Sequence, residues 1–161
     1  REGEVQTAHG AFRLHVFRDA DDGQLHIALS RGAIDPQTPT LVRVQQAAAL
    51  RDLLSTDVPG QRRNWNAARC LERIDREGRG VLVLLSQPES QHQLLASVDA
   101  ALGVSGPGEG GAERAPVHSL IGVGSQILRQ LGVGQMRLMG VPSRYNAISG
   151  FGLEVLEHVA Y

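Results

Sequence analysis

The chain has 161 residues, of which 42% are hydrophobic, so it is long enough for one domain with a substantial core. Its formal net charge of −1 and its 4% aromatic content give no electrostatic or base-stacking reason to expect nucleic acid, or an anionic membrane, as a partner. The single cysteine, Cys70, excludes an internal disulfide framework and a cysteine-rich metal site, and it favours a reducing, cytoplasmic setting.

The first third of the sequence predicts an antiparallel hairpin followed by another strand. Residues 11–18 alternate between apolar and polar side chains, as in a strand with one buried face. Residues 19–23 are rich in Asp and Gly, which is typical of a turn, and residues 25–29 resume the alternation. After a loop with two prolines, residues 41–44 predict a strand, and residues 46–54 predict one or two helical turns.

The rest of the sequence alternates between predicted helices and strands. The apolar positions of residues 64–76 fall on one helical face, and residues 81–85 form a continuous apolar run, typical of a strand buried on both faces. Residues 103–116 consist largely of Gly, Pro, Ser and Glu and predict a flexible loop. Further helices are predicted over residues 91–102, 125–131 and 143–149, and further strands over residues 136–139 and 153–156. This order predicts an α/β domain in which crossover connections link strands of one sheet.

Five short motifs follow one another in an order that is typical of one enzyme family. They are T-A-H-G-A-F at 7–12, A-L-S-R-G at 28–32, L-V-R-V followed by E-G-R-G between Thr40 and Leu85, G-S-Q-I-L-R-Q-L-G-V at 124–133, and G-F-G-L-E-V at 150–155. Together they resemble GTP cyclohydrolase II, the zinc enzyme that opens riboflavin biosynthesis. The resemblance implies a single domain over residues 1–161, with a mixed sheet, an N-terminal antiparallel hairpin and flanking helices.

The resemblance also implies a zinc site, for which this chain lacks the ligands. In the family, three thiolates hold zinc, and the metal lowers the pKa of a bound water that attacks the purine ring of GTP. The three ligand positions fall on Ala48, Gln61 and Arg63 in this chain. A methyl group cannot ligate zinc, and a cation would repel it. We therefore expect this domain to hold no metal and no other cofactor.

The positions that the family uses to bind and process the nucleotide differ as well. The phosphate-binding loop of the family falls on residues 86–94, which contain neither of its arginines. The next segment is shorter than in the family and lacks the helix with a catalytic tyrosine, and the catalytic Asp and Arg of the family fall on Val117 and Ser119. We therefore expect no catalytic residue in this chain. The basic side chains that remain as candidates for a nucleotide contact are Arg43, Arg62, Arg63 and Arg144.

A few residue types invite a functional interpretation that has an ordinary structural alternative. His15 and His26 lie on the two strands of the hairpin and could ligate a metal together, although two solvated side chains on a polar face are favoured. Cys70 lies on the apolar side of its helix, which favours a buried, inert thiol over a nucleophile. An apolar stripe on the helix at 91–102 predicts core packing or a subunit contact, and it consists of Leu94, Leu95 and Val98.

The family domain often forms the C-terminal half of a bifunctional protein whose N-terminal half is 3,4-dihydroxy-2-butanone 4-phosphate synthase. The chain begins at Arg1 without an initiator Met, and we expect it to be a C-terminal part of such a riboflavin-biosynthesis protein. Our first hypothesis is a catalytically degenerate, homodimeric domain that stabilises, dimerises or regulates a fused synthase, which would itself use Mg²⁺. One alternative is a domain that senses a nucleotide or a flavin. Another is residual GTP cyclohydrolase II activity, which would require a metal.

Overall fold

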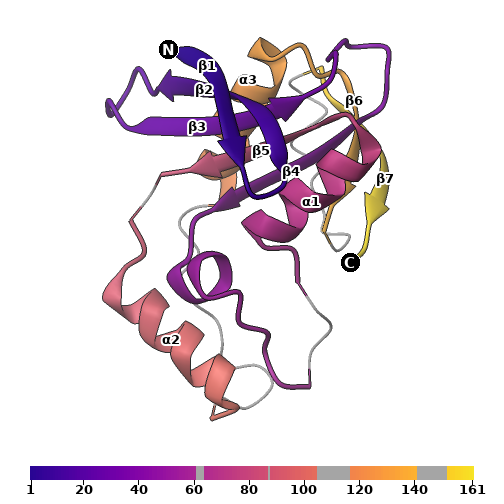
Figure 1. Cartoon of the computed structure of the whole chain (residues 1–161). Coiled ribbons are helices and arrows are strands. Elements are labelled where there is room, and N and C mark those ends of the chain that lie inside the picture. The colour runs from indigo at the N-terminus through magenta and orange to yellow at the C-terminus, as the bar shows by residue number, and fades with distance from the viewer. Residues whose placement is uncertain (61–63, 87, 105–116, 141–151) are drawn as a thin grey trace.

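Seven strands among the described residues form one mixed sheet, and helices lie on both of its faces (Figure 1). The computed structural model describes residues 1–60, 64–86, 88–104, 117–140 and 152–161, with the backbone alone for 117–121. The strands are β1 (Glu2–Thr7), β2 (Gly10–Arg18), β3 (Leu25–Arg31), β4 (Thr40–Gln46), β5 (Gly80–Leu85), β6 (Gln135–Met139) and β7 (Glu154–Val159). Their order across the sheet is β1-β2-β3-β5-β4-β6-β7. This architecture confirms the predicted α/β class, with a mixed sheet and an N-terminal antiparallel hairpin.

The N-terminal part of the sheet is antiparallel and has one strand more than the predicted hairpin. β1 pairs with β2, and β2 pairs with β3. β1 does not show a strand pattern in the sequence because it carries the exposed polar residues Glu2, Glu4 and Gln6, and Val5 is its one partly buried apolar residue. Charged residues suit a strand at the edge of a sheet, since they discourage pairing with another chain.

β5 lies at the centre of the sheet, between its antiparallel neighbour β3 and its parallel neighbour β4. Its side chains alternate between two cores. Val81 and Leu85 pack with α3 (Val117–Gln130), whereas Leu82 packs with α1 (Ala67–Glu77) on the other face. The predicted strand that is buried on both faces is therefore confirmed.

α1 begins and ends at residues that are suited to helix termini. The side chain of Asn66 accepts a hydrogen bond from the backbone N–H of Arg69 at 2.8 Å, which satisfies one open amide of the first turn. Gly78 ends the helix in the left-handed region, with φ of 76°. The helix predicted over residues 64–76 is therefore confirmed, with its first turn starting after the Asn66 cap.

α3 is longer than the helix predicted over residues 125–131, because glycines that suggest a helix start lie inside it. Ser125 is buried within the helix and is not its N-cap. Gly124 faces β4, where an added Cβ would lie 2.7 Å from Cγ1 of Val44. Glycine at this position thus permits close packing of helix on sheet. The predicted strands near the C-terminus are observed as β6 and β7, and the helix predicted over residues 143–149 lies outside the described residues.

A single π-helical turn, η1 (Ala49–Leu53), and the helix α2 (Gln91–Leu102) lie apart from the sheet, at the end of the molecule away from the N-terminus (Figure 1). A capping box at Ser90 begins α2, but no residue of α2 is buried. Leu95 is 59% exposed, so the apolar stripe of this helix is not core. No helix in the described ranges is both long and apolar enough to span a bilayer.

Candidate functional site

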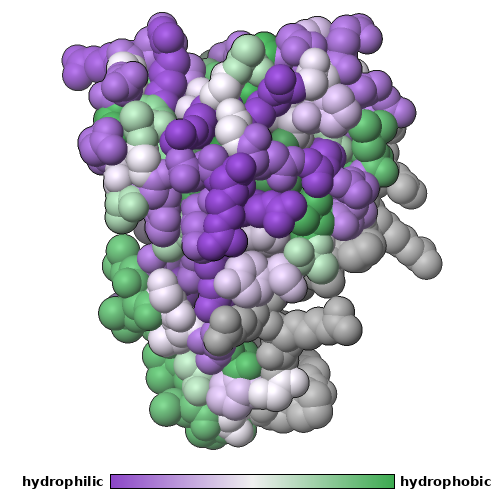
Figure 2. Space-filling view, turned by 45° about the vertical axis from the view of Figure 1, so that its right-hand side comes forward, coloured by the Kyte–Doolittle hydropathy of each residue, from purple (hydrophilic) through white to green (hydrophobic). Residues whose placement is uncertain are grey.

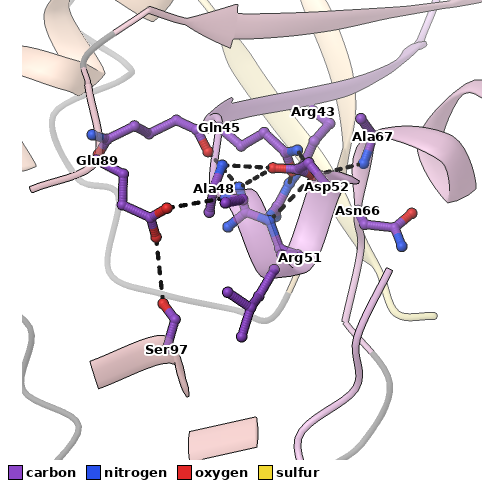
Figure 3. A network of polar contacts seen from close by, with 12 residues as sticks. Arg43, Gln45, Ala48, Arg51, Asp52, Asn66, Ala67, Glu89 and Ser97 are labelled. Atoms are coloured by element: carbon purple, nitrogen blue, oxygen red, sulfur yellow. Dashed lines mark hydrogen bonds and ion pairs between the residues drawn. The ribbon is translucent and has the colours of Figure 1, made fainter. Parts of the chain in front are cut away.

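The carboxylate of Asp52, on η1, joins the chain segments that surround the first of the predicted zinc positions (Figure 3). Oδ1 accepts hydrogen bonds from Nε2 of Gln45 at 2.8 Å and from the backbone N–H of Ala67 at 2.9 Å. Oδ2 accepts from the backbone N–H of Ala48 at 2.9 Å. One side chain, 8% exposed, thus ties the end of β4 and the turn η1 to the first residue of α1. We call this arrangement the Asp52 hub.

Arg51 supplies the positive charge that this buried carboxylate requires. Its NH2 group lies 2.8 Å from Oδ2 of Asp52, and it also donates to the carbonyl oxygen of Gln46. Burial acts to raise the pKa of Asp52, but the hydrogen bonds from Arg51, Ala48 and Ala67 act together against it, and the resulting pKa is below its ordinary value. The hub is therefore an ionised carboxylate whose two oxygens are both engaged by donors of the chain itself.

A second carboxylate, Glu89, connects η1 to α2. It lies in the loop after β5, where the resemblance predicts the phosphate-binding loop of the family. Its Oε2 accepts from the backbone N–H of Ala49 at 3.0 Å, and its Oε1 accepts from Oγ of Ser97 at 3.5 Å. This loop therefore holds two elements of the chain through an anionic side chain, which is the charge opposite to the one that a phosphate requires.

Contacts with the C-terminal residues also hold the segment before α1 and the first turn of this helix. Arg69 makes two hydrogen bonds to the carboxylate of Asp57, at 2.8 and 3.0 Å, and its guanidinium lies 4.8 Å from the ring centre of Tyr161. The indole N–H of Trp65 donates to the carbonyl oxygen of Val159 at 2.9 Å. These contacts fix the approach to α1 against β7 and the C-terminus.

Of the three predicted zinc positions, the structure describes Ala48, whereas Gln61 and Arg63 lie outside the described residues. The amide of Ala48 is engaged by the Asp52 hub, and its methyl group offers no lone pair to a metal. The one thiol of the sequence, Cys70, is fully buried, and burial raises its pKa to about 12.

The available donors therefore do not fit a site of three thiolates, since the whole sequence contains one cysteine. Within the described ranges, no group of three or more His, Cys, Asp or Glu side chains is placed to hold a metal ion. The expectation of a metal-free domain stays a prediction, and we derive no chemical step through a metal.

Among the four nucleotide candidates, Arg43 is the one that the described residues include. Its Nε donates to Oε1 of Gln45 at 3.0 Å, and its NH1 donates to the carbonyl oxygen of Met139 at 2.8 Å. Arg43 therefore links β4 to the end of β6. The other candidates, Arg62, Arg63 and Arg144, lie outside the described residues.

The positions that correspond to the catalytic Asp and Arg of the family, Val117 and Ser119, fall in the first turn of α3, where the structure describes the backbone. The structure describes no side chain at these two positions. Their assignment as former catalytic positions stays a prediction.

The two hairpin histidines have separate partners and are not solvated. His26 is 4% exposed, and its Nδ1 accepts from the backbone N–H of Ser86 at 3.2 Å. Nε2 of His15 lies 2.8 Å from Oγ of Ser30, and its Nδ1 lies 3.3 Å from the carboxylate of Glu2. Burial lowers the pKa of His15, against the attraction of Glu2, which acts to raise it. The prediction that both histidines are solvated is wrong, because the sheet buries this face beyond the hairpin.

Asp52 and Glu89 are the residues that sequence reasoning overlooks. The one signal for Asp52 is its position four residues after Ala48, a spacing that allows a carboxylate to accept the open amide at the start of a helical turn. The other partners of Asp52 come from β4 and α1, and only the fold brings these together.

Comparison with known proteins finds one family. The profile of GTP cyclohydrolase II matches residues 1–160. A 3,4-dihydroxy-2-butanone 4-phosphate synthase from Pseudomonas aeruginosa is 40% identical over 158 residues, which cover 98% of this chain and 42% of that protein. The riboflavin biosynthesis protein RibBA of Porphyromonas gingivalis is 33% identical over 175 residues, which cover 98% of this chain and 40% of that protein.

A solved structure has the same fold. It is the crystal structure of RibBX, a two-domain 3,4-dihydroxy-2-butanone 4-phosphate synthase from A. baumannii, and it superposes with a TM-score of 0.67 at 31% identity. The match covers 100% of this chain and 39% of that one. The chain thus spans about two fifths of the length of the relatives that it matches.

Proposed function

Since the chain belongs to the GTP cyclohydrolase II family, we propose that it is a non-catalytic support domain of a riboflavin-biosynthesis protein. In this role it stabilises, dimerises or regulates a 3,4-dihydroxy-2-butanone 4-phosphate synthase to which it is joined. The relatives are the evidence for this role. They include proteins that are named as that synthase, and this chain matches about two fifths of their length. The joined synthase would use Mg²⁺, and the protein would act in the cytoplasm.

The observation that carries this proposal is the Asp52 hub, because it lies where the resemblance places the first zinc ligand. Ala48 contributes its amide to the hub, and the carboxylate of Asp52 receives donors from β4, η1 and α1. The hub holds these segments in one arrangement and leaves neither carboxylate oxygen of Asp52 open to a ligand. A region organised in this way suits a rigid support domain better than it suits the binding and turnover of GTP.

The sensor alternative requires that basic side chains meet a phosphate. Arg43 instead donates to Met139 and Gln45, so no described residue favours this alternative over support. Isothermal titration with GTP, GMP and riboflavin phosphate checks it, and binding heat with any of the three would favour a sensor.

The experiment for the support role uses the full-length protein and measures the temperature at which the synthase loses activity. The Asp52→Asn variant weakens the hub at constant size. We expect the midpoint of synthase inactivation to fall, because the support domain unfolds earlier. The matched control is Asp21→Asn, the same change at an exposed turn, which should leave the midpoint unchanged. A support role is refuted if Asp52→Asn destabilises this domain and the synthase midpoint stays the same.

A further inference from the structure

Three polar side chains from three neighbouring strands meet at the N-terminal edge of the sheet. Nε2 of His15 on β2 lies 2.8 Å from Oγ of Ser30 on β3, and its Nδ1 lies 3.3 Å from the carboxylate of Glu2 on β1. Glu2 and His15 are also direct partners in the ladder between β1 and β2. We call this arrangement the His15 cluster. The side chain of His15 is 13% exposed, so its ring is largely shielded from water.

The partners of this imidazole match its neutral form. A carboxylate can only accept, so Nδ1 carries the hydrogen that faces Glu2, and Nε2 keeps a lone pair for the hydroxyl of Ser30. Protonation removes that lone pair. It also places a cation near Arg13, whose NH2 group lies 2.5 Å from the other carboxylate oxygen of Glu2. Both changes disfavour the protonated ring while β1 stays in place.

The same residue types form the triad of serine hydrolases, but the His15 cluster lacks the rest of such a site. Ser30 is 7% exposed, and its strand is paired on both sides. The backbone amides of β3 are therefore used in the sheet and do not form an oxyanion hole. The cluster is thus suited to a structural role.

β1 is the strand that can leave the sheet with the least loss of core. It lies at the end of the strand order, next to β2, and Val5 is its one residue that packs against a core. Glu2, Glu4 and Gln6 are exposed, and the upper part of the molecule, to which β1 belongs, presents mainly hydrophilic surface in Figure 2. Elements with few buried apolar contacts open at a lower free energy than the whole fold.

We propose that β1 is a pH-sensitive strap, which protonation of His15 releases from β2 in mildly acidic solution. Release separates Glu2 from His15 and turns β2 into the edge strand, so the ring meets water and carries its charge without the cost of burial. The rest of the sheet stays folded. The strap is a property of this chain alone and does not depend on a joined synthase.

The charged groups around His15 give the direction of the effect. Glu2 acts on it from β1, Arg13 from β2, and the amino group of Arg1 from the start of the chain. On β3, His26 points to the same face but binds a backbone amide. Burial is the main cause that lowers the pKa of His15, Glu2 acts against it, and Arg13 adds to it.

This direction fixes the range of pH in which the strap opens. A histidine whose pKa is lowered by folding stabilises the closed strap fully above its unfolded pKa of about 6.5. That contribution is lost as pH falls through the folded pKa. The hydrogen bond from Arg13 lowers the pKa of Glu2, so Glu2 keeps its charge over this range.

Hydrogen exchange of the backbone amides, followed by mass spectrometry, tests the strap. After correction for the direct effect of pH on exchange, we expect the protection of β1 to fall about threefold between about pH 7.5 and about pH 5.5. At both pH values β1 should exchange faster than β5, because it opens without the rest of the sheet. The amides of α2, at the end of the molecule away from the N-terminus, should keep their protection (Figure 1).

Two matched variants show whether His15 is the group that titrates. His15→Gln keeps a polar side chain that cannot take up a proton, so the protection of its β1 should be equal at both pH values. His92→Gln makes the same change at an exposed position of α2 and should keep the threefold fall. Equal falls in the parent and His15→Gln, or equal protection of β1 and β5, would overturn the proposal.

A measurement on the parent chain keeps the test decisive even if His15→Gln does not fold. Nuclear magnetic resonance follows the titration of the His15 ring directly. We expect a pKa below the ordinary value of about 6.5. A measured pKa at or above that value would overturn the strap, because protonation would then favour the closed strand.

Discussion

At the scale of single residues, one carboxylate organises the chain around Ala48, the first of the predicted zinc positions. Asp52 receives donors from Gln45, Ala48 and Ala67, and Arg51 balances its charge. A buried carboxylate of this kind stabilises a fold only while all of its donors are in place, because a donor or acceptor left without a partner is costly. The stability of the domain should therefore depend strongly on the Asp52 side chain.

We expect Asp52→Asn to destabilise the chain by about 1.5–3 kcal/mol, the usual range for hydrogen bonds to a charged group. The amide has one acceptor oxygen, and its NH₂ group would face donors such as Arg51 and the amide of Ala48. Urea unfolding, followed by circular dichroism, measures the change. Asp21→Asn should stay within about 0.5 kcal/mol of the parent, as exposed substitutions usually do. Equal midpoints for the two variants would show that the hub does not stabilise the fold.

The same carboxylate predicts how stability depends on pH. The pKa of Asp52 is lower in the folded chain than its ordinary value, so its contribution is fully present above the unfolded pKa of about 3.9. That contribution is lost as pH falls through the folded pKa. The stability difference between the parent and Asp52→Asn should therefore be constant from about pH 6 to pH 8 and should shrink below about pH 4. A difference that grows on acidification would contradict the assignment.

The sequence predicts that the zinc ligands of the family are missing, but it does not predict the hub that engages the amide of Ala48. A resemblance compares position with position, so it reveals that Ala48 cannot ligate a metal. The donors to the Asp52 carboxylate come from the end of β4, the start of η1 and the start of α1. A short sequence motif cannot predict a contact among segments that only the fold brings together. For the same reason the burial of His26 could not be read from the alternation of its strand, because the amide of Ser86 that it binds lies 60 residues further along the chain.

At the scale of elements, α3 and β4 pack so closely that a glycine is required between them. We expect Gly124→Ala to destabilise the chain by about 1–3 kcal/mol, because the new Cβ would lie 2.7 Å from Val44. In a Val44→Ala background the smaller side chain removes the clash with the new Cβ. Gly124→Ala should therefore destabilise the Val44→Ala variant less than it destabilises the parent chain. Chemical denaturation of all four combinations gives the coupling energy.

Gly122→Ala is the control for this prediction. An added Cβ at Gly122 meets no atom of the described residues within 4 Å, so the higher helix propensity of alanine should stabilise the chain by up to about 1 kcal/mol. If Gly124→Ala and Gly122→Ala changed the free energy of unfolding by the same amount, close packing against Val44 would not explain why residue 124 is a glycine.

Most elements could be predicted from periodicity, and the exceptions have physical causes. The strand at 81–85 and the helix at 64–76 are strongly patterned because each packs against a core. β1 carries too few apolar residues to show a pattern, since it lies at the edge of the sheet. α3 begins earlier than predicted because Gly124, which suggests a break, is a packing position inside the helix.

At the scale of the whole molecule, the chain combines the scaffold of its family with the Asp52 hub at the first of the predicted zinc positions. The chain superposes on part of a two-domain synthase with a TM-score of 0.67, so the architecture is that of the family. The end of β4, the turn η1 and the start of α1 are held together by the Asp52 hub. Each feature is consistent with a domain that serves a joined enzyme through its structure.

The release of formate from GTP tests the central claim most directly. The full-length protein is incubated with GTP and added zinc, and formate is measured against a heat-denatured sample of the same protein. Our account predicts no formate above that background at any zinc concentration, because Ala48 and the buried Cys70 offer the metal no accessible thiolate. Zinc-dependent formate release with multiple turnovers would contradict the account and would establish a working cyclohydrolase.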